Sequence, residues 1–405
     1  MNSRNQSAKK KKKGKKVYED NDVALHTTFA DATIVSLYFS HIIFDGLGRK
    51  ELLDAWVLTL QGRDDEVPAV IEDDPLELLE GRNRPDRLEK QKDTSNNIAK
   101  TNESEGGKEE EEVSKLASKQ INKAQFLVLI CRILLDMAWI WLISWFTNAE
   151  EDEIQSRLIC IPGAYLERLR QDALSQSPHE HPFLSEGDVL FAWWARQYIN
   201  SRITSPTTSK QTISLINYMN LRRIMQREGL TEPNTALLAN AVLPIPTLMS
   251  ARELMTKPLG YIAAALRRSL KDLGTAKQIQ AQMNLHRAVF DKTGEMPTYG
   301  DGRMHMVICT NWTKGGFFDV DFSAAMVQEH QGDGYEPGKV KEEENAVVMK
   351  GKPSAVMIHI TGTPPATFAF LSLFAILGKD GFGNYWILGF LRKRYWDRIE
   401  RELER

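Results

Sequence analysis

The stretch Ser40-His41-Ile42-Ile43-Phe44-Asp45-Gly46-Leu47-Gly48 is the part of the chain around which the remaining sequence is best organised. A run of β-branched and aromatic residues, 33–39, precedes it and predicts a strand. Apolar residues at helical spacing follow it and predict a helix over 48–61. The histidine is therefore expected in a strand-to-helix turn, where the flanking elements can hold a catalytic side chain rigidly.

His41 and Asp45 are separated by three residues and followed by Gly46, which gives the pattern H-x-x-x-D-G. A neutral imidazole has an ordinary pKa near physiological pH, so it can take a proton from an alcohol or amine and return it later in the same reaction. A structural turn histidine would fit the same pattern, and the chain has eight histidines from which a chance match can arise. His41 is the candidate catalytic residue, and its support has to come from other motifs.

Length and composition set the first limits on fold and function. The chain of 405 residues can form two domains or one large α/β domain. Its 52 basic and 54 acidic residues leave a net charge of −2, so nothing in the overall charge indicates nucleic-acid binding. The three cysteines stand in apolar runs without C-x-x-C spacing, which predicts buried thiols in a reducing, cytoplasmic compartment and no metal site.

Two segments are rich in charge. Residues 1–19 contain seven lysines between positions 9 and 16 and lack the apolar core of a secretory signal. They are expected to form a disordered tail, with a nuclear address or a membrane-surface tether as alternatives. Residues 81–122 have many charges and few aromatic residues, which predicts a flexible insertion or, as an alternative, a partner site.

Residues 126–146 are the most apolar stretch of the chain. The length would permit a membrane span. However, Arg132 and Asp136 stand near its middle, where charges oppose insertion, and at four residues apart they could pair on a helix. A helix on or in a soluble fold and a membrane-bound helix both remain open, so membrane contact through 126–146 is an alternative to a purely cytoplasmic protein.

The remainder of the chain alternates strand and helix patterns. Ser185 and Asp188 are placed as the N-cap and third residue of a capped helix. His179 and His181 alternate as metal ligands can, but no third ligand is near, so we expect a surface loop. The other expected elements are strands 157–161, 212–220, 238–243, 304–310, 317–322 and 355–361, helices 165–173, 251–273 (interrupted at Pro258), 276–292 and 392–405, and a hairpin with loop 379–383.

Four stretches, in this order, resemble the BAHD-type coenzyme A acyltransferases, in particular the fungal branch of secondary metabolism that includes trichothecene acetyltransferase-like enzymes. The hairpin 376–386 resembles the same branch, and the similarity spans residues 20–405 apart from the charged insertion. The four stretches are His41-x-x-x-Asp45-Gly46 with its flanking strand and helix, 184–194 (LSEGDVLFAWW), 217–222 (NYMNLR) with 240–244 (NAVLP), and 310–312 (TNW) with 319–322 (DVDF).

The resemblance implies an α/β fold of two chloramphenicol acetyltransferase-like domains with mixed sheets and flanking helices. Residues 20–200 would form the N-terminal domain, 201–211 a crossover linker, and 212–405 the C-terminal domain. In the family a much longer stretch precedes the histidine, so the first domain is expected to be incomplete here. Family members are usually monomeric.

The resemblance also implies an activity. His41 would be the general base that deprotonates a hydroxyl or amine of a small-molecule acceptor. The acceptor would then take an acyl group, in the simplest case an acetyl group, from acyl-CoA. Acyl-CoA is a co-substrate in this scheme and not a bound cofactor.

The other motif residues are implied to support the site. Asp45 would pair with Arg222 or Arg223 and, together with Gly46, hold the turn in shape. Asp321 would support the contact between domains. The family motif D-F-G-W-G reads DFSAA at 321–325, and this difference keeps a second hypothesis open, in which the protein is a catalytically inactive member that acts as a binding protein.

Overall fold

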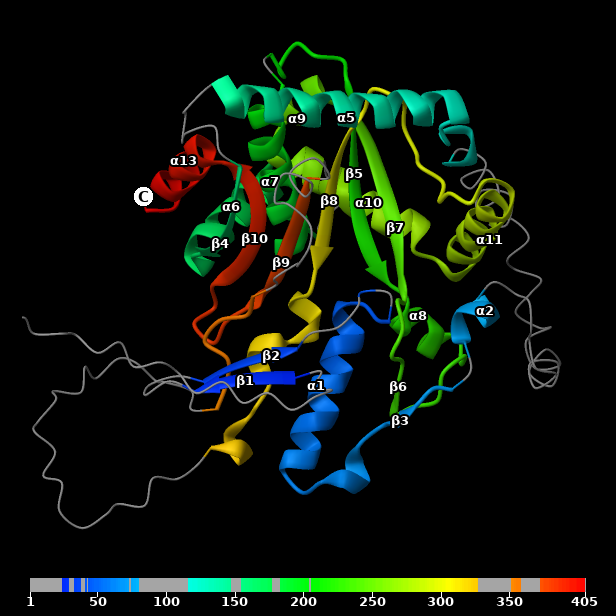
Figure 1. The fold of residues 1–405 in the computed structure, drawn as a ribbon, viewed down its shortest axis with the longest axis vertical. Helices are drawn as coiled ribbons and strands as arrows, with labels where there is room; N and C mark the ends of the chain where they lie inside the picture. The colour runs from blue at the N-terminus through cyan, green and yellow to red at the C-terminus, as the bar shows by residue number, and fades with distance from the viewer. Residues whose placement is uncertain are drawn as a thin grey trace, which may run out of the picture.

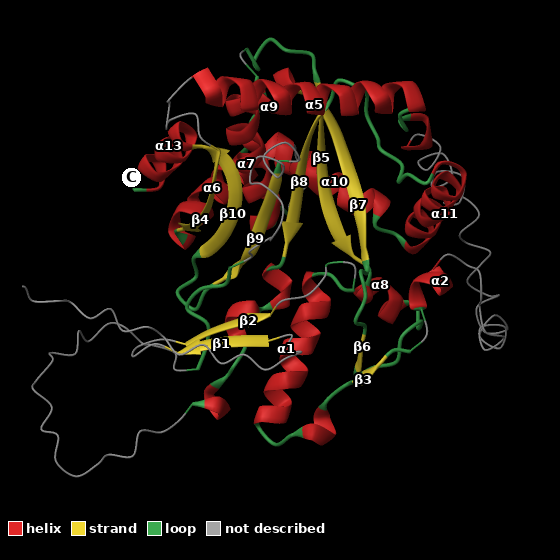
Figure 2. Cartoon of the chain, in the orientation of Figure 1, coloured by secondary structure: helices red, strands yellow, loops and turns green. Residues whose placement is uncertain are grey.

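The structure, a computed structural model, is a mixed α/β fold, as the sequence predicted (Figure 1). Figure 2 shows one large sheet with helices packed around it and a separate two-stranded hairpin. The structure describes residues 24–28, 33–37, 41, 43–72, 74–79, 116–146, 154–176, 183–203, 205–326, 351–357 and 372–404. The tail 1–19 and the loop with His179 and His181 lie outside the described residues.

The large sheet has six strands in the order β4-β10-β9-β8-β5-β7. Strands β5, β8 and β9 run parallel to one another, and the other pairings are antiparallel, so the sheet is mixed. The bounds are β4 Ile154–Ile161, β5 Thr212–Asn220, β7 Val242–Ser250, β8 His305–Asn311, β9 Leu373–Lys379 and β10 Tyr385–Arg392. Two short pairs lie apart from it, β1 Ala24–Thr28 with β2 Thr33–Leu37, and β3 Ala69–Val70 with β6 Thr235–Ala236.

The helices begin and end close to their predicted positions. Ser185 and Asp188 form the predicted capping box, and Pro258 separates α9 from α10, since proline cannot continue a helix. The bounds are α1 Gly46–Leu60, α2 Pro75–Leu79, α5 Lys123–Phe146, α6 Gly163–Ser175, α7 Glu186–Arg202, α8 Arg222–Arg227, α9 Ala251–Thr256, α10 Leu259–Leu273, α11 Ala276–Thr293 and α13 Lys393–Leu403.

The main core lies between the sheet and helices α6, α7 and α10, which pack together. Trp194 of α7 is fully buried there and stacks on Phe374 of β9, with ring centroids 4.7 Å apart. Gly389 of β10 lies directly under the same indole, so any larger residue at that position would overlap the ring. Strand β9 alternates, with Phe374 facing this core and Ala375 facing a second cluster on the opposite side.

The predicted domain boundary at 201–211 falls inside this sheet-and-helix unit. Strand β4, from before the linker, pairs along its whole length with β10 near the end of the chain. Helices α6 and α7, also before the linker, share one core with β5 and α10 after it. The assignment of residues 154–200 to the N-terminal domain is therefore corrected: they pack with residues 212–404, because β4 finds its hydrogen-bond partner there.

Three element predictions are wrong in part. The strand placed at 238–243 runs from Val242 to Ser250 and includes two prolines, which is possible because β7 is an edge strand of the sheet. Residues 317–319 form a 3-10 turn and 320–322 have no regular secondary structure, so no strand is present; Phe317 and Phe318 are both buried, and their apolar run gives no alternation. Of the strand at 355–361, residues 355–357 are not in a strand, and 358–361 lie outside the described residues.

The predicted insertion 81–122 is corrected at its end. Leu116 and Ile121 are buried, and Gln120 forms a β-bridge with Tyr299. This packing follows from the two apolar side chains at the end of an otherwise charged segment. Residues 81–115 lie outside the described residues.

The apolar stretch 126–146 forms helix α5, which lies across one end of the molecule (Figure 1). Leu129 packs with Ile121 and Met304 on the body of the protein. Arg132 donates hydrogen bonds to the carbonyl of Arg303 and to Nδ1 of His305, while Asp136 pairs with Arg202 at 3.3 Å. In the described part of the chain, no helix combines the length and apolarity needed to cross a membrane.

Acidification should destabilise the fold through His305. Burial, with the nearby charges of Arg132 and Arg202, lowers the pKa of His305 to about 3, so this imidazole stays neutral in the folded state. In the unfolded chain this histidine takes up a proton near pH 6.5. Its contribution to the free energy of unfolding is therefore fully present above that pH and decreases by about 1.4 kcal/mol per pH unit as the pH falls. The free energies of unfolding of wild type and His305→Gln can be measured with urea at pH 7, 6 and 5. The advantage of wild type over the variant should decrease by about 2 kcal/mol between pH 7 and pH 5.

Comparing how the free energy of unfolding changes with pH in the two proteins isolates His305, because all other titrating groups are common to both. His286 is also buried, which lowers its pKa to about 4, and it contributes a slope of the same sign to both. Parallel pH dependences of the two proteins would contradict the assignment.

Candidate active site

His41 lies in the turn between the β1–β2 hairpin and helix α1, as predicted. His41 is exposed, and its main-chain carbonyl accepts a hydrogen bond from Nδ2 of Asn240 at 2.9 Å. Asn240 comes just before β7, so the turn is tied to a segment that lies far away in the sequence. Asn240 begins the motif 240–244, which predicted no role for it, and in the structure it holds the main chain at His41.

Asp45 is the N-cap of α1 and is 4% exposed. One carboxylate oxygen accepts hydrogen bonds from the backbone N–H groups of Leu47 and Gly48, at 3.0 and 2.9 Å. The other accepts from the backbone N–H of Ala241 and from Nη1 of Arg222, each at 2.9 Å. The carboxylate therefore both starts the helix and attaches it to the segments that follow β5 and precede β7.

Arg222 is the arginine that pairs with Asp45. Its guanidinium also donates to the carbonyls of Leu237 and Ala239, at 2.8 and 2.9 Å. The planar fork of an arginine suits such simultaneous contacts, whereas a lysine carries one compact charge. Arg222 thus links α1 to the loop 237–241, which precedes β7.

Glu51 is a second carboxylate on Arg222 that the sequence motifs did not indicate. Its Oε1 lies 3.1 Å from Nε of Arg222, and its Oε2 accepts the backbone N–H of Leu237 at 2.5 Å. Burial raises the pKa of Glu51, and the charge of Arg222 opposes that shift. No signature marks Glu51 in the sequence, because it is one of several polar residues on α1 and its partner is 171 positions away.

Gly46 is required by a close approach. A Cβ at this position would lie 2.6 Å from the indole of Trp312, which follows directly after β8. The indole donates to Oγ1 of Thr310 at 3.0 Å, and the guanidinium of Arg49 lies 4.4 Å above the ring. Burial lowers the pKa of Arg49 to about 10, although the charge of Asp45 opposes this. The turn at Gly46 therefore packs against Trp312 at the carboxyl end of β8.

The predicted supporting residue Asp321 lies apart from this network. Its carboxylate accepts the backbone N–H of Ser323 at 2.8 Å, and hydrogen bonds from Ser323 hold its pKa below the ordinary value. The neighbouring Phe322 packs edge-on against Trp56 of α1, with ring centroids 5.7 Å apart. The segment 321–325 thus contacts α1 through Phe322, while Asp321 shapes the local turn.

The five predicted residues therefore fall into two groups. His41, Asp45, Gly46 and Arg222 come together where β5 and β8, a parallel pair, have their carboxyl ends. Ligands of open α/β sheets bind outside the carboxyl ends of the strands. Asp321 lies outside this group, although its neighbour Phe322 contacts Trp56 of α1.

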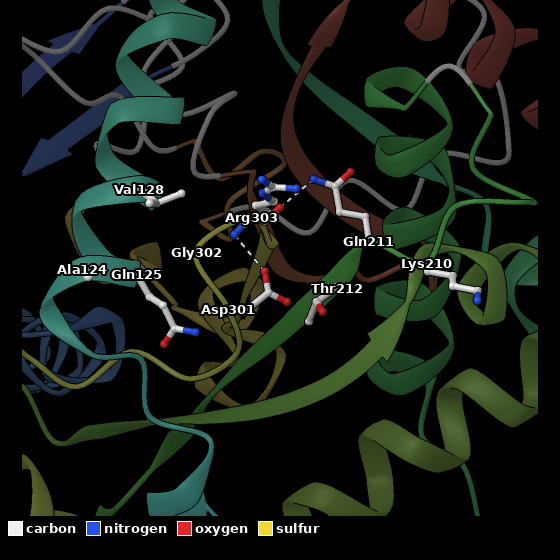
Figure 3. Close-up of a pocket in the computed structure, with 9 residues that line it drawn as sticks. All are labelled: Ala124, Gln125, Val128, Lys210, Gln211, Thr212, Asp301, Gly302 and Arg303. Carbon is white, nitrogen blue, oxygen red and sulfur yellow. Dashed lines mark hydrogen bonds between the residues drawn. The ribbon is translucent and has the colours of Figure 1, made fainter.

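Two cavities lie elsewhere. The larger, of about 800 Å³, is bordered by the first turns of α5, residues 210–212 and the loop 301–303 (Figure 3). It adjoins the start of β5, at the end of the strand opposite to Arg222. The smaller, of about 340 Å³, lies beside Gly163 and the hairpin residues Lys379 and Tyr385. Neither is lined by His41, Asp45 or Arg222.

The chain is similar to curated fungal proteins and to solved structures of acyltransferases. No family model matches the chain. The chain is 30% identical over 390 residues to calD of Penicillium decumbens, named a transcriptional regulator, covering 94% of this chain and 67% of calD. It is 29% identical over 394 residues to the acetyltransferase sphE of Aspergillus fumigatus, covering 93% and 65%. It is also 29% identical to the acetyltransferase adrJ of Penicillium rubens, covering 93% and 67%.

Among solved structures, TRI101 of F. sporotrichioides, in complex with coenzyme A and T-2, matches with a TM-score of 0.55 at 14% identity, covering 93% of this chain and 67% of that one. The likeness confirms the fold of the BAHD-type enzymes that the motifs predicted. The chain belongs to the BAHD-type coenzyme A acyltransferases.

The chain spans about two thirds of the length of the curated relatives that it matches. His41, Asp45 and Arg222 lie together within this acyltransferase fold, and their positions support the catalytic and structural roles proposed for them below. Relatives bear both enzyme and regulator names, since sdnM of Sordaria araneosa, 28% identical, is also named a transcriptional regulator. The family by itself therefore does not assign the role of each residue.

Proposed function

We propose that the protein transfers an acyl group, in the simplest case acetyl, from acyl-CoA to a hydroxyl or amine of a small molecule, with His41 as general base. One observation carries the proposal. An exposed histidine is held in a turn that a buried ion pair, Asp45 with Arg222, locks against the carboxyl ends of β5 and β8 in a coenzyme A acyltransferase fold. Such a turn can fix the position of a base while leaving its imidazole open to substrate.

The proposed reaction needs one group that moves a proton. The neutral imidazole of His41 takes the proton from the acceptor as its oxygen or nitrogen attacks the thioester carbonyl. A tetrahedral oxyanion forms and then collapses, the carbon–sulfur bond breaks, and the coenzyme A thiolate takes the proton back from the imidazolium. The acyl group moves directly, so no covalent bond to the protein forms.

Asp45 has a structural role in this proposal. A carboxylate offers about four lone-pair sites, and the four donors to Asp45 come from the helix start, Ala241 and Arg222. No capacity is left to orient an imidazole in the manner of a catalytic triad. His41 therefore acts without a carboxylate partner from its own motif, and Asp45 supports the site by holding the turn.

The proposed activity is tested by incubating the purified protein with acetyl-CoA and a panel of small alcohols and amines, and measuring free coenzyme A thiol together with the acylated product by mass spectrometry. We expect thiol release that depends on acceptor and protein. Release without an acylated product would indicate hydrolysis instead of transfer.

The altered segment Ser323-Ala324-Ala325 supports a second candidate function, a catalytically inactive member that acts as a binding protein. Calorimetric titration of coenzyme A and of the acceptor panel separates the two. Binding of a ligand with no turnover for any acyl-CoA and acceptor pair would favour the binding protein.

The location and assembly state belong to the same proposal. We propose a cytoplasmic location, which the three free cysteines support, and a monomer, which the resemblance to the family implies. Cys309 is buried as predicted, whereas Cys131 is exposed on α5, because the apolar run around it faces outward. Light scattering of the purified protein and fractionation of the cells would test the monomer and its location.

A further inference from the structure

Helix α5 has an inverted distribution of polar and apolar side chains. Its two central charges, Arg132 and Asp136, point to the protein body, where they bond to Arg303, His305 and Arg202. Its outer face is apolar. This outer face consists of Leu127, Val128, Ile130, Cys131, Leu134, Leu135, Ala138 and Leu142, all exposed.

The outer face is continuous along the helix. Positions 127, 131, 134, 138 and 142 follow the spacing of a single helix side over about four turns. Leu127, Leu134 and Leu135 are 63%, 57% and 69% exposed, values far above those of core leucines. Between Leu127 and Leu142, the described outward side chains carry no charge. A strip of this kind marks an interaction surface.

Cations border this strip. Lys123 starts the helix and is exposed. Lys210 and Arg303, both exposed, line the 800 Å³ cavity that adjoins Ala124, Gln125 and Val128 (Figure 3). The carboxylate of Asp301 in the same cavity accepts the backbone N–H of Arg303 at 2.8 Å. Three exposed cations and one carboxylate thus lie beside the first two turns of the apolar strip.

We propose that α5 docks the protein on an anionic lipid surface, with the outer face lying in the plane of the membrane. An apolar helix face inserts at the boundary between headgroups and acyl chains, and neighbouring lysines and arginines contact anionic headgroups. The helix lies across one end of the molecule, so its full length can lie parallel to a surface (Figure 1). The cations favour a lipid partner, since an apolar protein groove would leave them without counter-charges.

The test is co-sedimentation of the full chain with vesicles of phosphatidylcholine alone or in an equimolar mixture with phosphatidylserine. We expect binding to the anionic vesicles that weakens as salt rises. The double variant Leu134→Ser/Leu135→Ser should reduce binding by about tenfold or more. Because both side chains are more than half exposed, the fold should be retained, and circular dichroism checks this. Phe382→Ser, which changes an equally exposed apolar side chain on the β9–β10 hairpin, should bind as wild type.

A second variant tests the charges. Lys210→Gln/Arg303→Gln should lose the preference for phosphatidylserine while the apolar face is intact. The proposal is overturned if wild type does not sediment with anionic vesicles at low salt, or if the leucine variant binds as well as wild type. It is also overturned if the face is covered by a second copy, which would appear as a concentration-dependent dimer that the leucine variant abolishes, without vesicle binding.

Discussion

Replacement of His41 by alanine should lower kcat/KM for acyl transfer by about 10²- to 10⁴-fold, the usual contribution of a general base. The loss should be in kcat, because the imidazole acts on the proton that moves in the transition state and not on the binding of acyl-CoA. Steady-state kinetics with the acceptor found in the panel would measure it. The fold should be unchanged, since His41 is exposed and its contact to Asn240 runs through the backbone carbonyl.

Two controls make this result interpretable. Leu134→Ser/Leu135→Ser on α5, at the other end of the molecule from α1 (Figure 1), should keep wild-type rates and shows that an exposed substitution alone has no effect. Urea unfolding of His41→Ala should give the wild-type midpoint. Turnover that survives the His41 substitution within a few fold would refute the base assignment while leaving acyl transfer itself in place.

Replacement of Arg222 by alanine should lower the free energy of unfolding by about 3–5 kcal/mol, the cost of breaking a buried ion pair. The change leaves the buried carboxylate of Asp45 without its cation, removes a partner of Glu51, and takes the donors from the carbonyls of Leu237 and Ala239. Urea denaturation measures the loss. Activity should fall as well, because the turn that carries His41 loses its attachment.

The neighbouring helix position offers a matched control. Arg227, also on α8, pairs with Glu228 on the exposed surface, so Arg227→Ala should cost no more than about 1 kcal/mol. Arg222→Lys should fall between the two, because it keeps the charge but cannot serve all four partners at once. Equal effects of Arg222→Ala and Arg227→Ala would show that the pair with Asp45 contributes little.

The sequence predicted the local features of the site well. The H-x-x-x-D-G pattern lies in the predicted strand-to-helix turn, and Asp45 caps the helix that the apolar spacing indicated. The resemblance also supplied the pairing of Asp45 with an arginine. Glu51 and Trp312 were not assigned contacts, because their partners Arg222 and Gly46 lie 171 and 266 positions away and nothing in the spacing links them.

What the sequence by itself determined is whatever depends on neighbours along the chain: the capped start of α7, the break at Pro258, the hairpin before α13 and the turn that holds His41. These features follow from backbone geometry and short-range hydrogen bonds. They were readable because every group that forms them is close in sequence.

The tertiary structure decided which distant groups meet. It brought β4 to β10 across the predicted linker, and it placed Arg222 between two carboxylates. It also turned Arg132 and Asp136 inward and left the leucines of α5 outside. Spacing shows that a helix has an apolar side, but the surface against which the helix packs determines which side faces the protein.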